Sequence, residues 1–277
     1  MNLSICMAVR NGELTVETAI RSIRNQTVSD WELIVVDDGS ADRTVDIVAR
    51  IPDERIRLFR NSRSIGLAAC LNRALSEVRG KFVGRMDADD VCFPDRFERQ
   101  LGFLAQHPDV DLVGGQMLMF RGDWELMGVL NAPFNHDQIT RTPSKSLPIF
   151  HSTWTGKADW FARYKYDEKY LRAQDFELLL RALPYSTYAN LPDVVMGYRV
   201  ESGNLAKRRL SRKYQRLAIA KNRTSLGSSS TRAIAMLMVK DTADIFLSLV
   251  GIEASRMRAV PVPSLVERWG HLVDSLR

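Results

Sequence analysis

Three aspartates occur within four residues, at Asp87, Asp89 and Asp90, directly after an apolar segment. Carboxylates this close repel one another, so a fold that gathers them usually supplies a cation or leaves them in solvent. Oxygen ligands suit a hard divalent metal, Mg²⁺ or Mn²⁺, which keeps bound water and is often shared with substrate phosphates. The same residues could instead form a polar turn before the helix expected at Pro94. Both interpretations are open on this cluster alone.

Two other acids also stand at the ends of apolar segments. Asp38 follows Asp37 after such a segment, where its carboxylate could accept hydrogen bonds from a nucleobase or a ribose, or could merely cap a turn. Asp175 opens an amphipathic stretch that runs to Leu183. An acid at a helix start is often only a cap, but at the mouth of a phosphate site it would serve as a general base.

Few other residue patterns in the chain indicate a competing chemistry. We find no P-loop, no Gly-x-Gly-x-x-Gly motif and no Ser-His-Asp arrangement. The three cysteines are too few and too scattered for a disulfide framework or a cysteine-based zinc site, and a reducing cytoplasm is the simplest compartment for them. None of the four histidines shows the spacing of metal ligands: His107, His136, His151 and His271.

The first 110 residues alternate between strand and helix patterns. Apolar, β-branched runs predict strands over 3–9, 31–36, 55–59 and 81–86, and helical periodicity recurs between and after them. This order predicts an α/β fold with a mainly parallel sheet and helices on both faces. Ligands bind beyond the carboxyl ends of such strands. The acidic clusters at 37–38 and 87–90 should therefore share one edge of the sheet.

The rest of the chain is less regular. Residues 111–204 suggest a strand pair over 110–120 and 124–130, a helix over 174–183 and a strand over 194–200. From residue 205 onward the patterns are helical and basic. The run 233–250 is apolar but contains Lys240, Asp241 and Asp244, which argue against a transmembrane helix. The start of the chain lacks the charged and apolar regions of a secretory signal.

The positive charge of the protein is concentrated in this last region. The 277 residues carry a net charge of +6, yet residues 1–204 hold 25 Lys and Arg against 28 Asp and Glu, and residues 205–277 hold 14 against 5. A basic helical stripe over 207–223 could dock on an anionic membrane surface. Alternatively, it is a solvated basic face packed against the body of the protein. Nucleic-acid binding is not expected, because the basic stripe lacks interleaved stacking aromatics beyond Tyr214.

Several short motifs, taken in order, resemble those of family 2 glycosyltransferases. The likeness covers about residues 1–200, and each motif is weak alone but specific in this sequence of spacings. The motifs are Ser4-Ile5-Cys6-Met7-Ala8-Val9-Arg10-Asn11-Gly12, Ala19-Ile20-Arg21-Ser22-Ile23-Arg24-Asn25-Gln26-Thr27, Trp31 to Ser40, Gly66-Leu67-Ala68 with Asn72, Asp87-Ala88-Asp89-Asp90, and Gln174-Asp175.

The resemblance implies the GT-A fold, a nucleotide-binding αβα sandwich, and assigns roles on the donor side. Ala8 and Arg10 would line the nucleotide pocket, and Asp38 would bind the base. Asp87 would lie near the ribose and donor sugar, and Asp89 would be the metal ligand of the Asp-x-Asp motif, with Mn²⁺ or Mg²⁺ as the cofactor. Arg10 stands where the family often has an aromatic residue, which leaves the nucleotide preference open.

On the acceptor side, the resemblance makes Asp175 the catalytic base. Gln174 replaces an acid that often precedes it, and the loss of that like charge would favour an ionised Asp175. His151 falls in a segment where the family often has a histidine, so it could act on the acceptor side or could be purely structural.

These patterns together predict three regions and an activity. Residues 1–204 would form the GT-A domain, with a nucleotide-binding half at 1–110 and an acceptor-binding half at 111–204, and residues 205–277 a helical basic extension. The expected function is inverting, non-processive transfer of a sugar, with a UDP-sugar favoured as donor, to a glycan or lipid-linked glycan in polysaccharide or glycolipid synthesis. It would take place in the cytoplasm or on the cytoplasmic face of the membrane. The alternatives are a sugar-1-phosphate nucleotidyltransferase and an inactive nucleotide-sugar-binding module.

Overall fold

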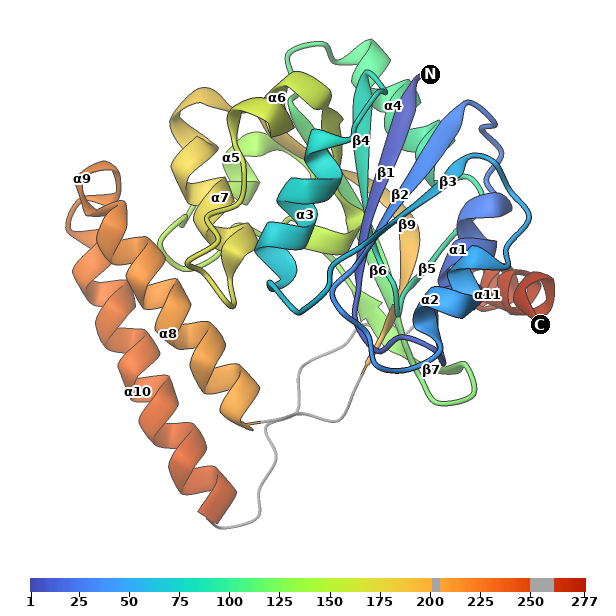
Figure 1. Cartoon of the computed structure of the whole chain (residues 1–277). Helices are drawn as coiled ribbons and strands as arrows, with labels where there is room; N and C mark the ends of the chain where they lie inside the picture. The colour runs from blue at the N-terminus through green and yellow to red at the C-terminus, as the bar shows by residue number, and fades with distance from the viewer. Residues whose placement is uncertain (201–204, 250–261) are drawn as a thin grey trace.

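A nine-stranded sheet, curved and covered by helices on both faces, organises the chain (Figure 1). The computed structural model describes residues 1–200, 205–249 and 262–277. The strands lie in the order β3-β2-β1-β4-β8-β6-β9-β5, with β7 paired to β6. They are β1 (Leu3–Val9), β2 (Trp31–Asp37), β3 (Ile56–Arg60), β4 (Phe82–Asp87), β5 (Val91–Cys92), β6 (Leu112–Arg121), β7 (Glu125–Leu130), β8 (Thr155–Lys157) and β9 (Tyr188–Arg199).

The first four strands of that order are parallel, as predicted, and β2, β1 and β4 are buried on both faces. Along β1, Ile5 packs on one side among the helices α1 (Val16–Arg24), α2 (Thr44–Ala49) and α4 (Arg96–Gln106). Cys6 packs on the other side with α3 (Leu67–Ser76), α6 (Ala158–Arg163) and α7 (Gln174–Ala182). Strands buried on both faces appear in the sequence as continuous apolar runs. The alternation of strands with amphipathic helices could therefore be predicted from the sequence. The predicted αβα sandwich is confirmed.

The second half of the sheet mixes directions and brings late residues to the site. β8 is antiparallel to β4 and to β6, whereas β9 runs parallel to β6. The two-residue β5 pairs with the end of β9, Val91 opposite Gly197. This pairing fastens the segment after β4 to the carboxyl end of β9. The short elements α5 (His136–Ile139), η1 (His151–Thr153) and η2 (Leu183–Tyr185) lie in the connections between these strands.

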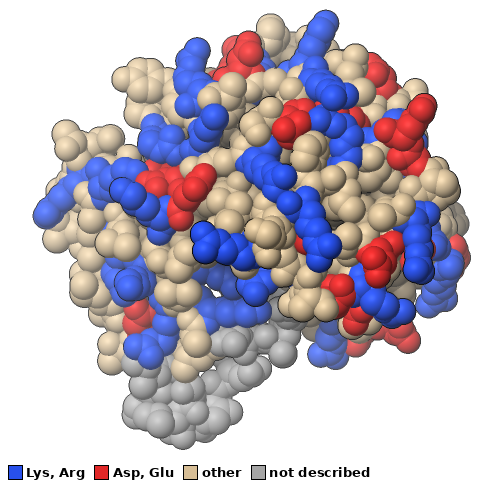
Figure 2. All heavy atoms as spheres, in the orientation of Figure 1, with Lys and Arg blue, Asp and Glu red and all other residues tan. Residues whose placement is uncertain are grey.

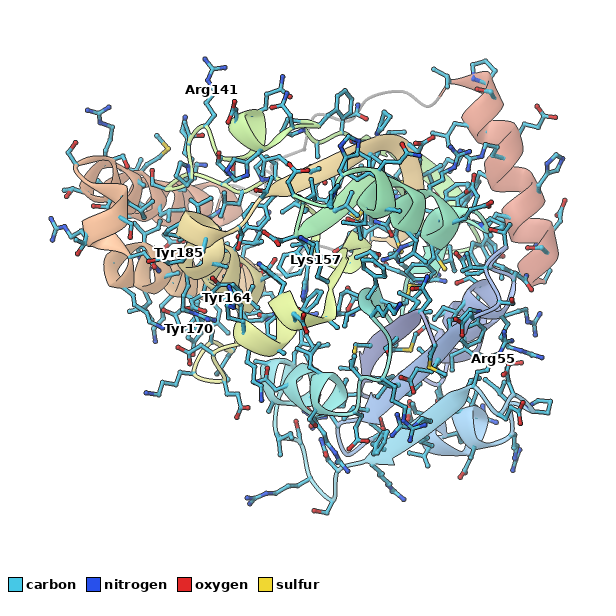
Figure 3. The ribbon with its side chains drawn as sticks, turned by 90° about the horizontal axis from the view of Figure 1, so that it is seen from above. Arg55, Arg141, Lys157, Tyr164, Tyr170 and Tyr185 are labelled. Atoms are coloured by element: carbon cyan, nitrogen blue, oxygen red, sulfur yellow. The ribbon has the colours of Figure 1, made fainter. Side chains whose placement is uncertain are left out.

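Beyond residue 205 the chain forms two separate features. The helices α8 (Leu205–Lys221), α9 (Arg223–Leu226) and α10 (Ser229–Leu249) make a hairpin, in which α8 packs against α7. The last helix, α11 (Pro263–Leu276), lies on the opposite side of the body (Figures 1 and 3). Its Trp269 packs among Phe93 and Phe120. The division of the chain at 205 stays a prediction, although α11 adds to the core of the body.

The basic charge of the hairpin is only partly neutralised. Arg212 and Arg216 of α8 both pair with Asp241 of α10. Lys221, at the end of α8, pairs with Asp167 and Glu177 of the body, each at 2.9 Å. Other cations lie on the outside of the hairpin, as Figure 2 shows for one face. Within the described ranges, no helix has the length and apolar character needed to cross a membrane.

Candidate functional site

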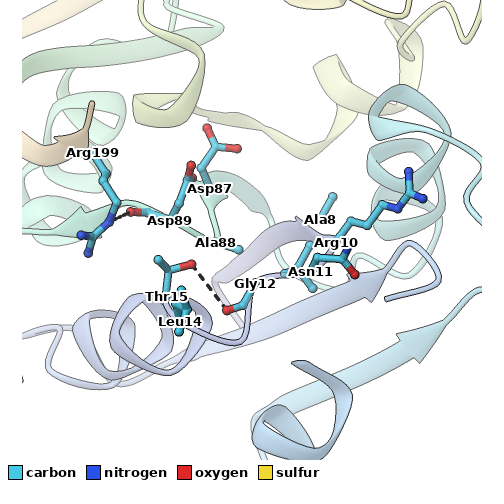
Figure 4. A pocket seen from close by; sticks show the side chains of 11 residues that line it. Ala8, Arg10, Asn11, Gly12, Leu14, Thr15, Asp87, Ala88, Asp89 and Arg199 are labelled. Atoms are coloured by element: carbon cyan, nitrogen blue, oxygen red, sulfur yellow. Dashed lines mark hydrogen bonds between the residues drawn. The ribbon is translucent and has the colours of Figure 1, made fainter. Parts of the chain in front are cut away.

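A hollow of about 370 Å³ opens at the carboxyl ends of β1 and β4 (Figure 4). It is lined by residues 8–12 and 14–15 after β1, by residues 87–89 after β4, and by Arg199 at the end of β9. Four predicted site residues therefore meet in one place: Ala8, Arg10, Asp87 and Asp89. Their meeting follows from the parallel pairing of β1 with β4, which sets Ala8 opposite Asp87.

The loop after β1 is held by the loop after β2. The main-chain N–H of Asn11 donates to Ser40 Oγ at 2.8 Å, and that of Gly12 donates to Thr44 Oγ1 at 2.8 Å. Asn11 adopts a left-handed conformation with φ of 51°, which asparagine tolerates better than most residues. Its side chain accepts a hydrogen bond from the Ala41 N–H. These contacts give the wall of the hollow a defined shape.

Asp87 is paired with a buried cation. The Arg85 guanidinium lies beneath the site, 2% exposed, and forms an ion pair with the Asp87 carboxylate. A charge buried this deeply must be paired, and Asp87 is the acid that pairs with it. The Asp87 side chain remains 30% exposed, so one side of it still faces the hollow. Arg85 thus fixes the direction of the first carboxylate of the cluster.

The remaining acids of the cluster connect to the end of β9. Arg199 Nε donates to the main-chain carbonyl of Asp89 at 3.0 Å, and the Arg199 N–H donates to Asp90 Oδ1 at 3.0 Å. The Arg199 guanidinium also lies 4.6 Å from the centroid of the Phe120 ring, a cation–π contact. The positive charge of the Arg199 guanidinium is therefore held at the rim of the hollow, beside Asp89.

The donor set of this cluster fits a hard divalent cation. Within the described residues, no group of three or more metal-ligating side chains forms a closed protein cage. Mg²⁺ and Mn²⁺ do not need one at a substrate site, because one or two carboxylates, water and phosphate oxygens complete their shell. Burial, and then the charges of Asp87 and Asp89, raise the pKa of Asp90 well above its ordinary 3.8. A cation at Asp89, with Asp87 beside it, would offset that concentration of negative charge.

Asp38 lies one residue past β2 and is already engaged by protein donors. Its Oδ1 accepts from Asn61 Nδ2 and the Ile65 N–H, and its Oδ2 from Ser64 Oγ and the Gly66 N–H, at 2.7–3.2 Å. Burial alone would raise the pKa of Asp38, but the hydrogen bonds from Ile65, Ser64 and their neighbours outweigh it and lower the pKa to about 2. Asp38 therefore organises residues 61–66 before α3. Its contact with a base stays a prediction.

Asp175 approaches the same cluster from another element. It lies in the first turn of α7, which starts after Ala173 in a left-handed conformation with φ of 54°. Burial raises the pKa of Asp175; its own main-chain N–H and that of Phe176 oppose the shift, and the charge of Asp87 adds to it. The expectation that Gln174 would favour ionisation of Asp175 therefore meets a stronger, opposite effect of burial. A raised pKa suits a group that must accept a proton.

His151 contacts a residue that the sequence did not single out. Its Nε2 lies 2.7 Å from the hydroxyl of Tyr166. Burial, and next the Arg85 charge, lower the pKa of His151 well below its ordinary 6.5, so the imidazole is neutral near pH 7. Burial raises the pKa of Tyr166, which keeps its hydroxyl protonated. The charge of Arg85 opposes this rise in the pKa of Tyr166, and the charges of Asp175 and Asp87 add to it.

Three residues of the site were missed by the sequence reasoning. Arg85 had a local signal, because a single arginine inside the apolar run 82–86 must find a buried partner. Arg199 and Tyr166 had none, since each reaches the site only through the folding of distant segments. They lie 110 and 79 positions after Asp89 and Asp87, respectively.

Comparison with known proteins gives a consistent result. The model of the family described as "Glycosyl transferase family 2" matches residues 4–164. The putative glycosyltransferase EpsE of Bacillus subtilis is 33% identical over 185 residues, which are 65% of this chain and 66% of that protein. The UDP-Glc:alpha-D-GlcNAc-diphosphoundecaprenol beta-1,3-glucosyltransferase WfgD of Escherichia coli is 35% identical over 105 residues, 38% of this chain and 42% of WfgD. Both matches span less than two thirds of the relative's length.

The fold has solved counterparts. The structure of S. aureus TarS residues 1–349 in complex with UDP-GlcNAc superposes with a TM-score of 0.68 and 16% identity, over 100% of this chain and 82% of that one. At this identity the likeness concerns the fold alone. It agrees with the predicted α/β class and with the sheet described above.

Proposed function

Because the chain belongs to glycosyl transferase family 2, we propose that it transfers a sugar from a nucleoside diphosphate sugar to an acceptor hydroxyl with inversion of configuration. One observation carries this proposal. The hollow that contains Asp87 and Asp89 lies at the carboxyl edge of the parallel strands, and Asp175 approaches it from α7 closely enough for the Asp87 charge to raise its pKa. The proposed diphosphate site and the proposed proton acceptor would then be neighbours.

A UDP-sugar is the donor that we favour. The name of WfgD includes UDP-Glc, and the TarS structure contains UDP-GlcNAc. The nucleotide would occupy the hollow between Ala8 and Arg10 on one side and Asp87 on the other, with the base toward Asp38. Direct contact of the base with Asp38 would require one of the four protein donors on that carboxylate to give way.

The reaction proceeds by direct displacement at the anomeric carbon. The acceptor oxygen forms a bond to this carbon from the face opposite the nucleotide, while the bond from the carbon to the phosphate oxygen breaks. The carboxylate of Asp175 takes the proton of the acceptor hydroxyl, and the electron pair of the broken bond leaves with the nucleoside diphosphate. A single displacement inverts the configuration.

The cationic groups at the rim stabilise the leaving group. Arg199 and Arg10 line the hollow and would face the developing charge on the diphosphate. Asp89, with Asp87 beside it, would hold Mg²⁺ or Mn²⁺, which when bound supplies further positive charge to the diphosphate. Metal dependence is part of this proposal, as are the roles of the individual residues.

On the acceptor side, the pair of His151 and Tyr166 would orient the hydroxyl that reacts. A neutral imidazole hydrogen-bonded to a protonated tyrosine gives a polar wall that carries no charge. Such a wall accepts a sugar hydroxyl without competing with Asp175 for its proton. We assign a glycan or a lipid-linked glycan as the acceptor, in polysaccharide or glycolipid synthesis, because WfgD is named for a diphosphoundecaprenol-linked sugar.

The cysteines support a cytoplasmic location. All three are free and buried: Cys6, Cys70 and Cys92. Burial raises the pKa of both Cys6 and Cys70 to about 12, which keeps these thiols in their unreactive form. Free, inert thiols fit a reducing compartment.

A donor panel tests the proposal. The purified chain is incubated with Mn²⁺ and UDP-, GDP- or dTDP-sugars, with and without glycan acceptors, and free nucleoside diphosphate is measured. We expect release of UDP that rises with acceptor and is lost in Asp175→Asn. Formation of pyrophosphate from a nucleoside triphosphate and a sugar-1-phosphate would instead indicate a nucleotidyltransferase. Tight donor binding without turnover for any acceptor would indicate an inactive binding module.

A further inference from the structure

The hairpin of α8 and α10 exposes large apolar side chains to solvent. Leu217 on α8 is 47% exposed, and Met238 and Val239 on α10 are 55% and 68% exposed. Leu210 on α8 and Met236 on α10 are also exposed. The α8 residues recur at helical spacing, since Leu210, Lys213 and Leu217 follow each other by three and four positions. They form one stripe along the helix.

The packing of the hairpin accounts for its other faces. Ala218 and Ile219 of α8 are fully buried in the core that includes α7. Arg212 and Arg216 join α8 to α10 through Asp241. The stripe is therefore a separate, outward surface of α8, and neither the contact with α7 nor the contact with α10 needs it.

Cations border this apolar surface. Residues 205–249 contain ten Lys and Arg against two Asp. Arg209 and Lys213 are exposed and flank Leu210, and Lys240 is exposed directly after Val239. An apolar stripe edged by cations matches the interface of an anionic bilayer, where apolar side chains enter the headgroup region and cations meet lipid phosphates. A protein partner would more often be met by an apolar patch with fewer cations.

The hairpin also contacts the loop that leads to the proposed base. Tyr214 of α8 lies 5.7 Å from Tyr170, centroid to centroid, and Lys221 pairs with Asp167. Tyr170 is labelled in Figure 3, on the side of the body where the hairpin lies. The loop 166–173 begins at Tyr166, the partner of His151, and ends just before α7 and Asp175. A bilayer bound by the hairpin would therefore lie next to the acceptor side of the proposed site.

We propose that the α8–α10 hairpin docks the protein on an anionic lipid bilayer and that this contact turns the Asp175 side of the site toward acceptors carried in the membrane. The choice of a membrane-borne acceptor rests on the function proposed above, whereas the docking itself rests on the surface of the hairpin.

Vesicle flotation with the full chain tests the docking. The vesicles are phosphatidylcholine alone or phosphatidylcholine with about one third phosphatidylglycerol, in low and high salt. We expect binding to the anionic vesicles only, weakened by salt. The double variant Arg209→Glu/Lys213→Glu should lose about tenfold or more of its affinity. The matched variant Arg50→Glu/Lys81→Glu changes two exposed cations of the body by the same amount and should bind as the unmodified chain does.

A matched pair of valine variants tests the apolar part of the proposed membrane surface. Val239→Asp, on the hairpin, should reduce binding to anionic vesicles even in low salt, whereas Val266→Asp, at an exposed valine of α11, should not. Absence of binding to anionic vesicles, or equal losses in the hairpin and body variants, would overturn the proposal. So would a dimer in light scattering that Val239→Asp converts to a monomer while vesicle binding stays absent.

Donor binding separates this proposal from the proposed function. Calorimetry with UDP and Mn²⁺ should give the same affinity for the Arg209→Glu/Lys213→Glu variant as for the unmodified chain. If nucleotide binds normally but vesicles do not, the docking is wrong and the enzymatic proposal stands. If vesicles bind but no nucleotide does, the docking stands and the enzymatic proposal fails.

Discussion

Asn72 holds the main chain of Tyr166 by two hydrogen bonds. Its Oδ1 accepts from the Tyr166 N–H at 2.9 Å, and its Nδ2 donates to the Tyr166 carbonyl at 3.0 Å. Asn72 belongs to α3 in the first half of the chain, and Tyr166 starts the loop that leads to Asp175. A half-buried asparagine of α3, to which the sequence analysis gave no role beyond its place in a motif, therefore positions the partner of His151.

This relationship makes Tyr166 a positioning residue that can be tested by removing a single oxygen. Tyr166→Phe should lower kcat by about tenfold, because it leaves His151 without its hydrogen-bond partner, at a cost of about 1–3 kcal/mol. UDP affinity, measured by calorimetry, should not change. Tyr164→Phe is the matched control, since Tyr164 is a buried tyrosine that does not line the hollow. A weaker UDP affinity with unchanged kcat would contradict the assignment to the acceptor side.

Asp175→Asn should reduce transfer by about 10² or more while donor binding is retained, because the amide cannot accept the proton. Asp159→Asn alters an acid at the corresponding position of α6 and should stay within about twofold. In the unmodified chain, the base must be deprotonated to act. Since burial raises the pKa of Asp175, log kcat/KM should fall with decreasing pH through a value above 3.8. A pH profile flat to below that value would exclude Asp175 as the base.

Asp89→Ala should remove most of the Mn²⁺-dependent gain in UDP affinity, because the variant loses the carboxylate expected to share the cation with the diphosphate. Asp109→Ala, in the exposed turn between α4 and β6, removes the same charge at a residue that does not line the hollow. Titrations with and without Mn²⁺ compare the two variants. An unchanged metal effect in Asp89→Ala would reject Asp89 as the ligand.

Arg199→Lys should weaken UDP binding by about tenfold. Lysine keeps the charge but cannot both donate to the Asp89 carbonyl and lie on the Phe120 ring as the planar guanidinium does. Arg55→Lys serves as the control, because the Arg55 guanidinium also lies over an aromatic ring, that of Trp31, and pairs with Asp53, but it does not line the hollow. Equal UDP affinities of the two variants would remove Arg199 from the leaving-group contacts.

Asp38→Asn should lower the free energy of unfolding at pH 7 by about 1–2 kcal/mol. This figure is reduced for the screening of the charge by solvent at this edge of the sheet. The folded pKa of Asp38 is about 2, below its ordinary 3.8, so its carboxylate adds stability above pH 4 and loses that contribution as the pH falls toward 2. Urea unfolding at pH 7, 5 and 3.5 should show a constant difference between Asn and Asp at the first two values and a smaller one at the third. Asp46→Asn, on the surface of α2, should cost less than about 0.5 kcal/mol. A difference that grows on acidification would contradict this sign.

The sequence by itself determined the architecture of the first half and the position of its acids. Apolar runs of strand length between amphipathic helices specify buried parallel strands, and parallel strands bring their carboxyl ends to one edge. That is sufficient to place Ala8, Asp87 and Asp89 together, as they are found. Each of these signals is local, because secondary structure follows from the periodicity of neighbouring residues.

The tertiary structure decided which distant side chains complete the site. Arg199 meets Asp89 because β5 pairs with the end of β9, and Tyr166 meets His151 because Asn72 holds its main chain. The tertiary structure also decided which cations of the basic tail pair with the body and which remain exposed. Lys221 forms ion pairs with the body, whereas Arg209 and Lys213 remain on the outer surface of the hairpin. Such pairings depend on strand order and helix packing, and no local pattern of residues encodes them.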